Sequence, residues 1–275
     1  MRSFVRAAVC MGLGGASLAS AQTPIPLSVA GNEARATIAL PGDIGADLTI
    51  AFESVVGLTP TALDVSASLV SPLDPSLLGR LPGPAGVPVL FPVLVRIAPG
   101  ASSALAFSGV AAVSLHTHNL HLDPAVPLAL LKAAEGGPFR DVTVREGIGS
   151  YRAGGSTGEF SEFLIVVDSR PIDAVIGAKL DGLQALLAEH GASMPETVAG
   201  ALEARLSQAR ALYEAGAILA AIGETTAFSR YVQAHSGQDI PDVWRAHDTG
   251  RVNVAGLLRS AADTLRFSLD RKASR

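Results

Sequence analysis

The spacing of apolar residues changes near residue 170, and this change constrains the fold more than any other feature. Upstream, apolar and polar residues alternate in short runs, such as those around Ile50, Val65, Val95 and Ile165. A period of two predicts half-buried strands with one face on a core. Proline and glycine separate the runs, and no helical pattern lies between them, which favours an antiparallel sandwich.

Downstream of residue 170, apolar residues recur three and four positions apart, in stripes that end near Gly191, Gly216, Gly237 and the C-terminus. Four amphipathic stripes with short connections predict an antiparallel helix bundle. The first stripe includes Lys179.

These patterns predict an α+β chain with segregated parts. We expect a signal peptide over residues 1–21, an antiparallel β-sandwich (immunoglobulin-like or related) over 22–170, and a four-helix bundle over 171–275. The proline-rich stretch 71–88 is expected to be a long surface excursion. Trp244 is expected to plug the bundle core or the seam between the two parts. The sequence Ser-Met-Pro-Glu at 193–196 predicts a capping box for the second helix.

The N-terminus has the three regions of an export signal. Arg2 and Arg6 precede a short apolar run, and the small residues of Ala19-Ser20-Ala21 suit cleavage before Gln22. The run is too short to span a bilayer, which takes about 20 apolar residues. We therefore expect a periplasmic or extracellular protein with no transmembrane segment in the mature chain.

Composition restricts the possible partners. The only cysteine, Cys10, lies inside the predicted signal, so the mature chain would have no disulfide and no thiolate metal site. Acidic side chains outnumber basic ones, 25 to 21. No basic cluster interleaved with aromatic residues occurs, which argues against nucleic acid as a partner.

Three of the six histidines lie within the stretch SLHTHNLHLD at 114–123. The apolar positions are odd-numbered up to Leu115 and even-numbered from Leu120, so a single bulged residue near 117–119 is expected between them. The strand would then present four polar side chains on one outward face: His116, His118, His121 and Asp123.

These four side chains have two interpretations. Clustered imidazoles and a carboxylate suit Zn²⁺ or another divalent first-row metal. The same pattern is also that of a solvated strand face without an ion. Because no helical H-E-x-x-H or other metal motif accompanies the histidines, we favour the solvated face and keep the metal site as the alternative.

Residues 154–158 match the pattern G-x-S-x-G, which would make Ser156 a nucleophile. That chemistry needs a strand before the serine and a helix after it. Residues 159–168 instead predict a strand, so a glycine-rich hairpin loop is the favoured interpretation.

Several stretches resemble an uncharacterised family of exported bacterial proteins known only as a domain of unknown function. The resemblance is carried by VSASLVSPLDPSLLGRLP, FPVLVRI, LHTHNLH, GPFRDV, GEFSEFLIVVDSRPID, IPDVWRA and VNVAGLLRSAADTLRFSL. It implies membership over nearly the whole mature chain, and no activity. The helical part is also similar, less closely, to small helical modules attached to secreted bacterial enzymes, which implies an accessory role.

We therefore expect an exported, non-catalytic protein that binds an unknown protein or polysaccharide partner, or supports envelope structure. An apolar or charged concavity where the sandwich meets the bundle would favour this function, and a deep polar pocket would argue against it. The alternative is a metal-binding protein or metal-dependent enzyme centred on His116, His118 and His121.

Overall fold

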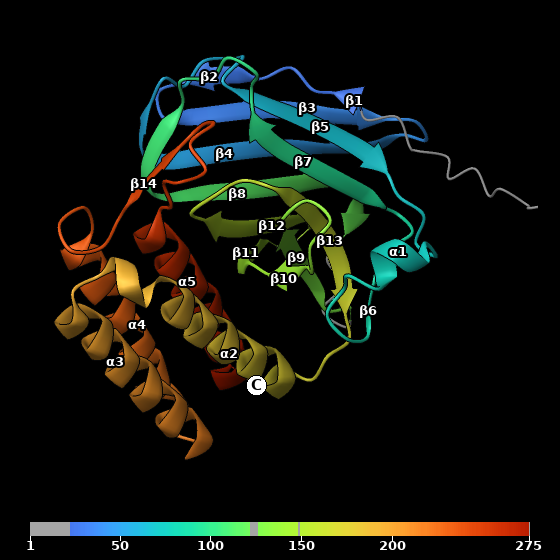
Figure 1. The fold of residues 1–275 in the computed structure, drawn as a ribbon. Helices are drawn as coiled ribbons and strands as arrows, with labels where there is room; N and C mark the ends of the chain where they lie inside the picture. The colour runs from blue at the N-terminus through green and yellow to red at the C-terminus, as the bar shows by residue number, and fades with distance from the viewer. Residues whose placement is uncertain (1–22, 122–125, 148, 275) are drawn as a thin grey trace, which may run out of the picture.

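The computed structural model describes residues 23–121, 126–147 and 149–274. The chain is α+β, with two antiparallel sheets followed by helices (Figure 1). The predicted signal peptide, Cys10 and Asp123 lie outside the described residues. Within the part of the chain that is described, no helix is long and apolar enough to cross a membrane.

Within the described residues, each sheet has seven strands. Sheet A follows the order β1 (Thr23–Pro24), β5 (Leu63–Leu69), β7 (Val93–Pro99), β13 (Glu162–Asp168), β9 (Leu128–Ala133) and β10 (Arg140–Asp141), with β6 (Ala85–Gly86) also paired to β13. Sheet B follows the order β11 (Thr143–Gly147), β12 (Ser150–Thr157), β8 (Ala106–His121), β4 (Ile44–Val56), β3 (Glu33–Leu40) and β2 (Ser28–Ala30), with β14 (Val243–Arg245) also paired to β8.

The alternating pattern places one core between the sheets. Ile38 and Leu48 of sheet B share a cluster of buried side chains with Val95 and Phe163 of sheet A. The period-two prediction is confirmed for these strands, because alternate residues of a strand point to opposite faces.

The stretch 71–88 is more than a surface excursion. It contains α1 (Pro75–Leu78) and β6, and its apolar side chains pack on the outer face of sheet A. Leu77 and Leu81 are buried with Leu131 and Leu164 of β9 and β13. These two strands are apolar on both faces, so their outer side chains need a cover.

The helical stripes form α2 (Ile172–His190), α3 (Glu196–Glu214), α4 (Ile218–His235) and α5 (Val254–Ala273). Their inward side chains share a second core that includes Ile176, Leu206, Phe228 and Leu258. The predicted capping box is wrong: the Ser193 hydroxyl donates to the carbonyl of His190 at 2.7 Å, and α3 begins without a side-chain cap.

The chain returns from the helices to sheet B through β14. Trp244 pairs with Phe107 of β8, and its ring packs 5.3 Å from the Phe107 ring and 5.4 Å from the Phe160 ring. Of the two expected positions, Trp244 therefore takes the seam, against the core of the sheets.

The first turn of α5 docks directly on sheet B. A Cβ on Gly256 would lie 2.5 Å from the carbonyl oxygen of Gly109, and one on Gly158 would lie 2.6 Å from the backbone nitrogen of Leu257. Only glycine allows these approaches. The buried Asn253 holds the contact, because its Oδ1 accepts from the Gly256 N–H and its Nδ2 donates to the Gly109 carbonyl, both at 2.7 Å.

We expect Asn253→Ala to lower the free energy of unfolding by about 1–2 kcal/mol, because the helix loses its cap and the Gly109 carbonyl loses a buried donor. Chemical denaturation measures the change. Asn253→Asp keeps the capping oxygen but turns a second carboxylate oxygen toward the buried Gly109 carbonyl oxygen, so its loss should be at least as large. If Asn253→Ala had the same midpoint denaturant concentration of unfolding as the wild type, this role would be contradicted.

Candidate functional site

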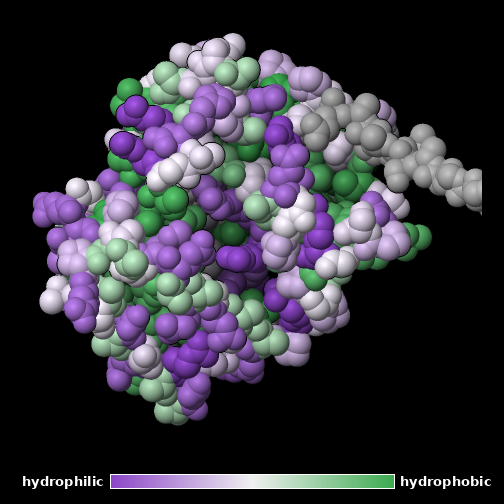
Figure 2. Space-filling model, viewed as in Figure 1, coloured by the Kyte–Doolittle hydropathy of each residue, from purple (hydrophilic) through white to green (hydrophobic). Residues whose placement is uncertain are grey.

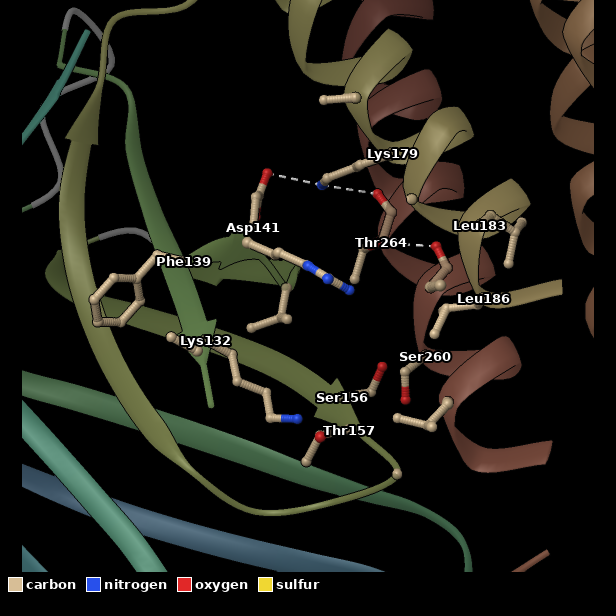
Figure 3. Close-up of a pocket in the computed structure, with 18 of the residues that line it drawn as sticks. Lys132, Phe139, Asp141, Ser156, Thr157, Lys179, Leu183, Leu186, Ser260 and Thr264 are labelled. Carbon is tan, nitrogen blue, oxygen red and sulfur yellow. Dashed lines mark hydrogen bonds and ion pairs between the residues drawn. The ribbon is translucent and has the colours of Figure 1, made fainter. Parts of the chain in front are cut away.

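A cavity of about 460 Å³ lies where the helices meet the sheets. Figure 2 shows the molecule hollowed at this place, and Figure 3 shows side chains from both sides pointing into it. Its floor comes from the end of β9, the segment 138–142 and the end of β12, and its wall comes from α2 and α5. We call it the seam cavity.

Two helix faces with small residues make the wall. The residues of α2 and α5 that line the cavity follow the spacing of one helix face: Val175, Ala178, Lys179, Gly182, Leu183 and Leu186, and Leu257, Ser260, Ala261 and Thr264. A Cβ built on Gly182 would meet no atom within 4 Å. The missing side chain at this position therefore leaves open space.

The seam cavity also gathers buried lysines. The sequence has three lysines, and two of them, Lys132 and Lys179, line this cavity. Their exposed fractions are 9% and 8%. Lysine is almost never buried without a partner, so the two ammonium groups need an explanation.

The ammonium group of Lys179 is fully satisfied by the protein. It lies 2.8 Å from Oδ2 of Asp141 and donates to the Thr264 carbonyl at 3.1 Å and to Oγ of Ser268 at 2.8 Å. Burial opposes ionisation of Asp141. The charge of Lys179 and two hydrogen bonds from Thr143 outweigh burial and hold the pKa of Asp141 below its usual range. Lys179 thus ties α2 to α5 and to β10.

The ammonium group of Lys132 has donors to spare. It lies 2.9 Å from Oε1 of Glu159, which is the one hydrogen-bond partner it has among the described residues. An ammonium group carries three donors. Burial lowers the pKa of Lys132, while the nearby Glu159 carboxylate opposes the shift.

Ser156 adds an unpaired hydroxyl to the floor. The residue is 6% exposed, and its Oγ has no hydrogen-bond partner among the described residues. Figure 3 shows Ser156 and Lys132 in the same space, with Thr157 and Ser260 beside them. A buried polar atom without a partner is uncommon in folded proteins, and a ligand group is one explanation.

The structure corrects the expected setting of Ser156. Residues 154–157 lie inside β12 and are not a hairpin loop, because the chain then crosses from sheet B to β13 of sheet A. No helix follows the serine, so the nucleophile-elbow interpretation is wrong. The adjacent Gly155 is needed for packing: a Cβ there would lie 2.9 Å from the Val142 carbonyl oxygen.

The histidine strand contains the expected irregularity. Between the pairs Arg152–His116 and Ser150–His121, β12 advances by two residues while β8 advances by five. The change of parity is confirmed, although the bulge is larger than one residue. Thr117 points inward there, and its hydroxyl donates to the Leu120 and Tyr151 carbonyls at 3.0 and 3.1 Å.

Two of the predicted metal ligands share a carboxylate that the sequence analysis did not identify. Nε2 of His118 lies 3.1 Å from Oδ2 of Asp47, and Nδ1 of His116 lies 3.9 Å from the same oxygen. The His118 hydrogen bond lowers the pKa of Asp47. His121 lies at the exposed end of β8. Among the described residues, no group of three His, Cys, Asp or Glu side chains is placed to hold a metal ion.

The sequence matches the family described as "Family of unknown function (DUF6689)" over residues 9–273. The chain belongs to this family. The predicted membership of a domain of unknown function is thereby confirmed, and the match spans both sheets and all the long helices. No curated protein and no solved structure gave a match.

We expect Asp141→Asn to lower the free energy of unfolding by about 3–5 kcal/mol, because it leaves the Lys179 charge buried without a counter-ion. Thermal and chemical denaturation measure the change. Adding Lys179→Met should recover much of the loss, since both buried charges are then gone.

The control is Asp181→Asn, which breaks the exposed pair with Arg210. Such pairs contribute about 1 kcal/mol or less. If Asp141→Asn and Asp181→Asn had equal effects, the buried pair would not stabilise the junction.

Proposed function

We propose that this protein is an exported, non-catalytic binding protein that holds a small molecule, or a small protruding group of a larger partner, in the seam cavity. The observation that carries the proposal is a buried polar floor with unused hydrogen-bonding capacity, in Ser156 and Lys132, beneath an apolar helix wall. Ligand pockets usually combine a largely apolar lining with a few fixed polar groups, and their volumes are of this order.

The position of the cavity supports binding as its role. The concavity expected at the junction exists, and it is both apolar and charged rather than a purely polar pocket. Its volume favours a small molecule or a single side group over a long polysaccharide segment. Export of the mature chain from residue 22 remains part of the proposal on the strength of the N-terminal sequence.

The finer fold description is also a proposal. We interpret the two sheets as an immunoglobulin-like or related sandwich. We interpret α2 to α5 as a four-helix bundle, which is supported by the single core that these helices share. The helical part would then be the accessory wall of the binding site, placed against the sheets by α5.

A panel of small molecules tests the binding function. Organic acids, alcohols, amines, sugars and short peptides are screened for their effect on the melting temperature. We expect at least one class to raise it for the wild type, because a ligand that binds only the folded state stabilises that state. Gly182→Leu, which fills the open space in the wall, should abolish this shift.

Gly177→Leu is the matched control. Gly177 lies on the same helix, a Cβ there also meets no atom within 4 Å, and the residue does not line the cavity. This variant should respond to ligands as the wild type does. Equal shifts in the Gly182 and Gly177 variants, or no shift with any compound, would overturn the proposal.

The metal site is the second candidate. His116 and His118 both approach Asp47, although the described residues contain no group of three side chains placed to hold a metal ion. This candidate predicts stoichiometric metal in the purified protein by elemental analysis, and loss of that metal on His116→Ala with His118→Ala. Added Zn²⁺, Ni²⁺ or Cu²⁺ should stabilise the wild type but not the double variant. If the purified protein holds no stoichiometric metal and added metal does not stabilise the wild type, this candidate is removed.

A further inference from the structure

The unused donors of the cavity floor point to one kind of ligand group. Ser156 offers a free hydroxyl, and Lys132 has ammonium donors that the protein does not engage. Arg140 also lines the cavity, but it is exposed, so solvent can reach the guanidinium donors that no other described residue engages. All three groups donate, so the complementary ligand atom is an acceptor, and charged donors favour an anionic one.

The balance of charge at the floor restricts the anion further. Lys179 is neutralised by Asp141, and Arg170 by Asp168, whose Oδ2 lies 2.6 Å from its Nη2. Glu189 lies on the exposed part of α2.

Of the other described charged side chains that line the cavity, Arg140, Glu159 and Glu189 are exposed to solvent, so Lys132 is the one buried charge that the protein leaves with unused donors. A ligand with one negative charge matches this one buried ammonium group, and a dianion would bring a second negative charge to the same buried place.

The wall opposite these donors is apolar. Leu183 and Leu186 of α2 and Leu257 of α5 face the cavity, and Gly182 and Ala261 keep the space between them open. Burying hydrocarbon there is favourable in proportion to the area removed from water. The ligand therefore needs an apolar body as well as a charged head.

We propose that the seam cavity binds a monocarboxylate with a hydrocarbon chain, whose carboxylate is held by Lys132, Arg140 and Ser156 and whose chain lies against α2 and α5. The inference rests on the proposed binding function and names its ligand class. The donors and the apolar wall come from different parts of the chain, and both line one cavity (Figure 3).

Isothermal titration calorimetry with four probes tests this assignment on the purified protein. Decanoate has the head and the chain, decanol has the chain without the charge, decyl phosphate has a dianionic head, and acetate has no chain. We expect decanoate to bind at least tenfold more tightly than each of the other three. Decyl phosphate binding as tightly as decanoate would assign the site to phosphate-bearing amphiphiles and overturn the monocarboxylate.

Two variants separate the head from the wall. Lys132→Met should weaken decanoate binding about ten- to a hundredfold, because a charged hydrogen bond is lost, and leave decanol binding unchanged. Gly182→Leu should weaken the binding of both decanoate and decanol, and Gly177→Leu should leave the binding of both unchanged. If Gly182→Leu proves unstable, Ala178→Leu, on the same lining face, takes its place.

The outcomes distinguish this inference from the proposed function. Equal binding of decanol and decanoate, both lost on Gly182→Leu, would overturn the carboxylate head and leave a binding cavity. A second outcome is that none of the four probes binds, but another class of compound in the panel binds and Gly182→Leu blocks that binding. This outcome would also overturn the inference alone. Failure of the whole panel would overturn both.

Discussion

The buried ion pair between Lys179 and Asp141 is the interaction on which the junction of sheets and helices depends. The Lys179 ammonium sends one donor to each of three partners in two elements: the carboxylate of Asp141 in β10, and the Thr264 carbonyl and the Ser268 hydroxyl in α5. Each of its donors is used, which is what makes a buried charge tolerable. This one group therefore links α2 directly to sheet A and to α5.

Lys132 lies in the same cavity, but most of the hydrogen-bond donors of its ammonium group are unused by the protein. Its burial is nearly that of Lys179, but the protein supplies it with one half-exposed carboxylate, whose side chain is 48% accessible. Two lysines in one cavity thus have different roles. One completes the fold, and the other keeps hydrogen-bonding capacity that the fold leaves unused, beside a serine hydroxyl in the same state.

Sequence periodicity was sufficient to predict a run of strands followed by four helices, because burial of one face imposes a period of two on strands and of 3.6 on helices. It also located the bulge in β8, since a change of parity requires extra residues between Leu115 and Leu120. Periodicity could not locate the cavity, because Val175 and Leu186 belong to the lining face of α2 and Ile176 and Leu187 to the bundle core, yet all four fit one stripe.

The missed signal was Lys179 itself. A lysine inside an apolar helical stripe requires a buried partner, and the sequence alone does not say that the partner is Asp141, 38 positions upstream in a short edge strand. β14 was missed for a similar reason. Its three residues are too few for a periodic pattern, and they pair with β8 across more than a hundred positions of sequence.

Neither the sheets nor the helices line the whole cavity by themselves. The donors of the floor come from residues 132–159, and the apolar wall comes from residues 175–261. A ligand that contacts both would stabilise their contact, because it binds only when the helices lie on the sheets. The glycine contacts of α5 at Gly158 and Gly256 make the same junction without a ligand. The fold therefore holds the cavity by itself, so the proposed binding would cost little free energy for ordering the site.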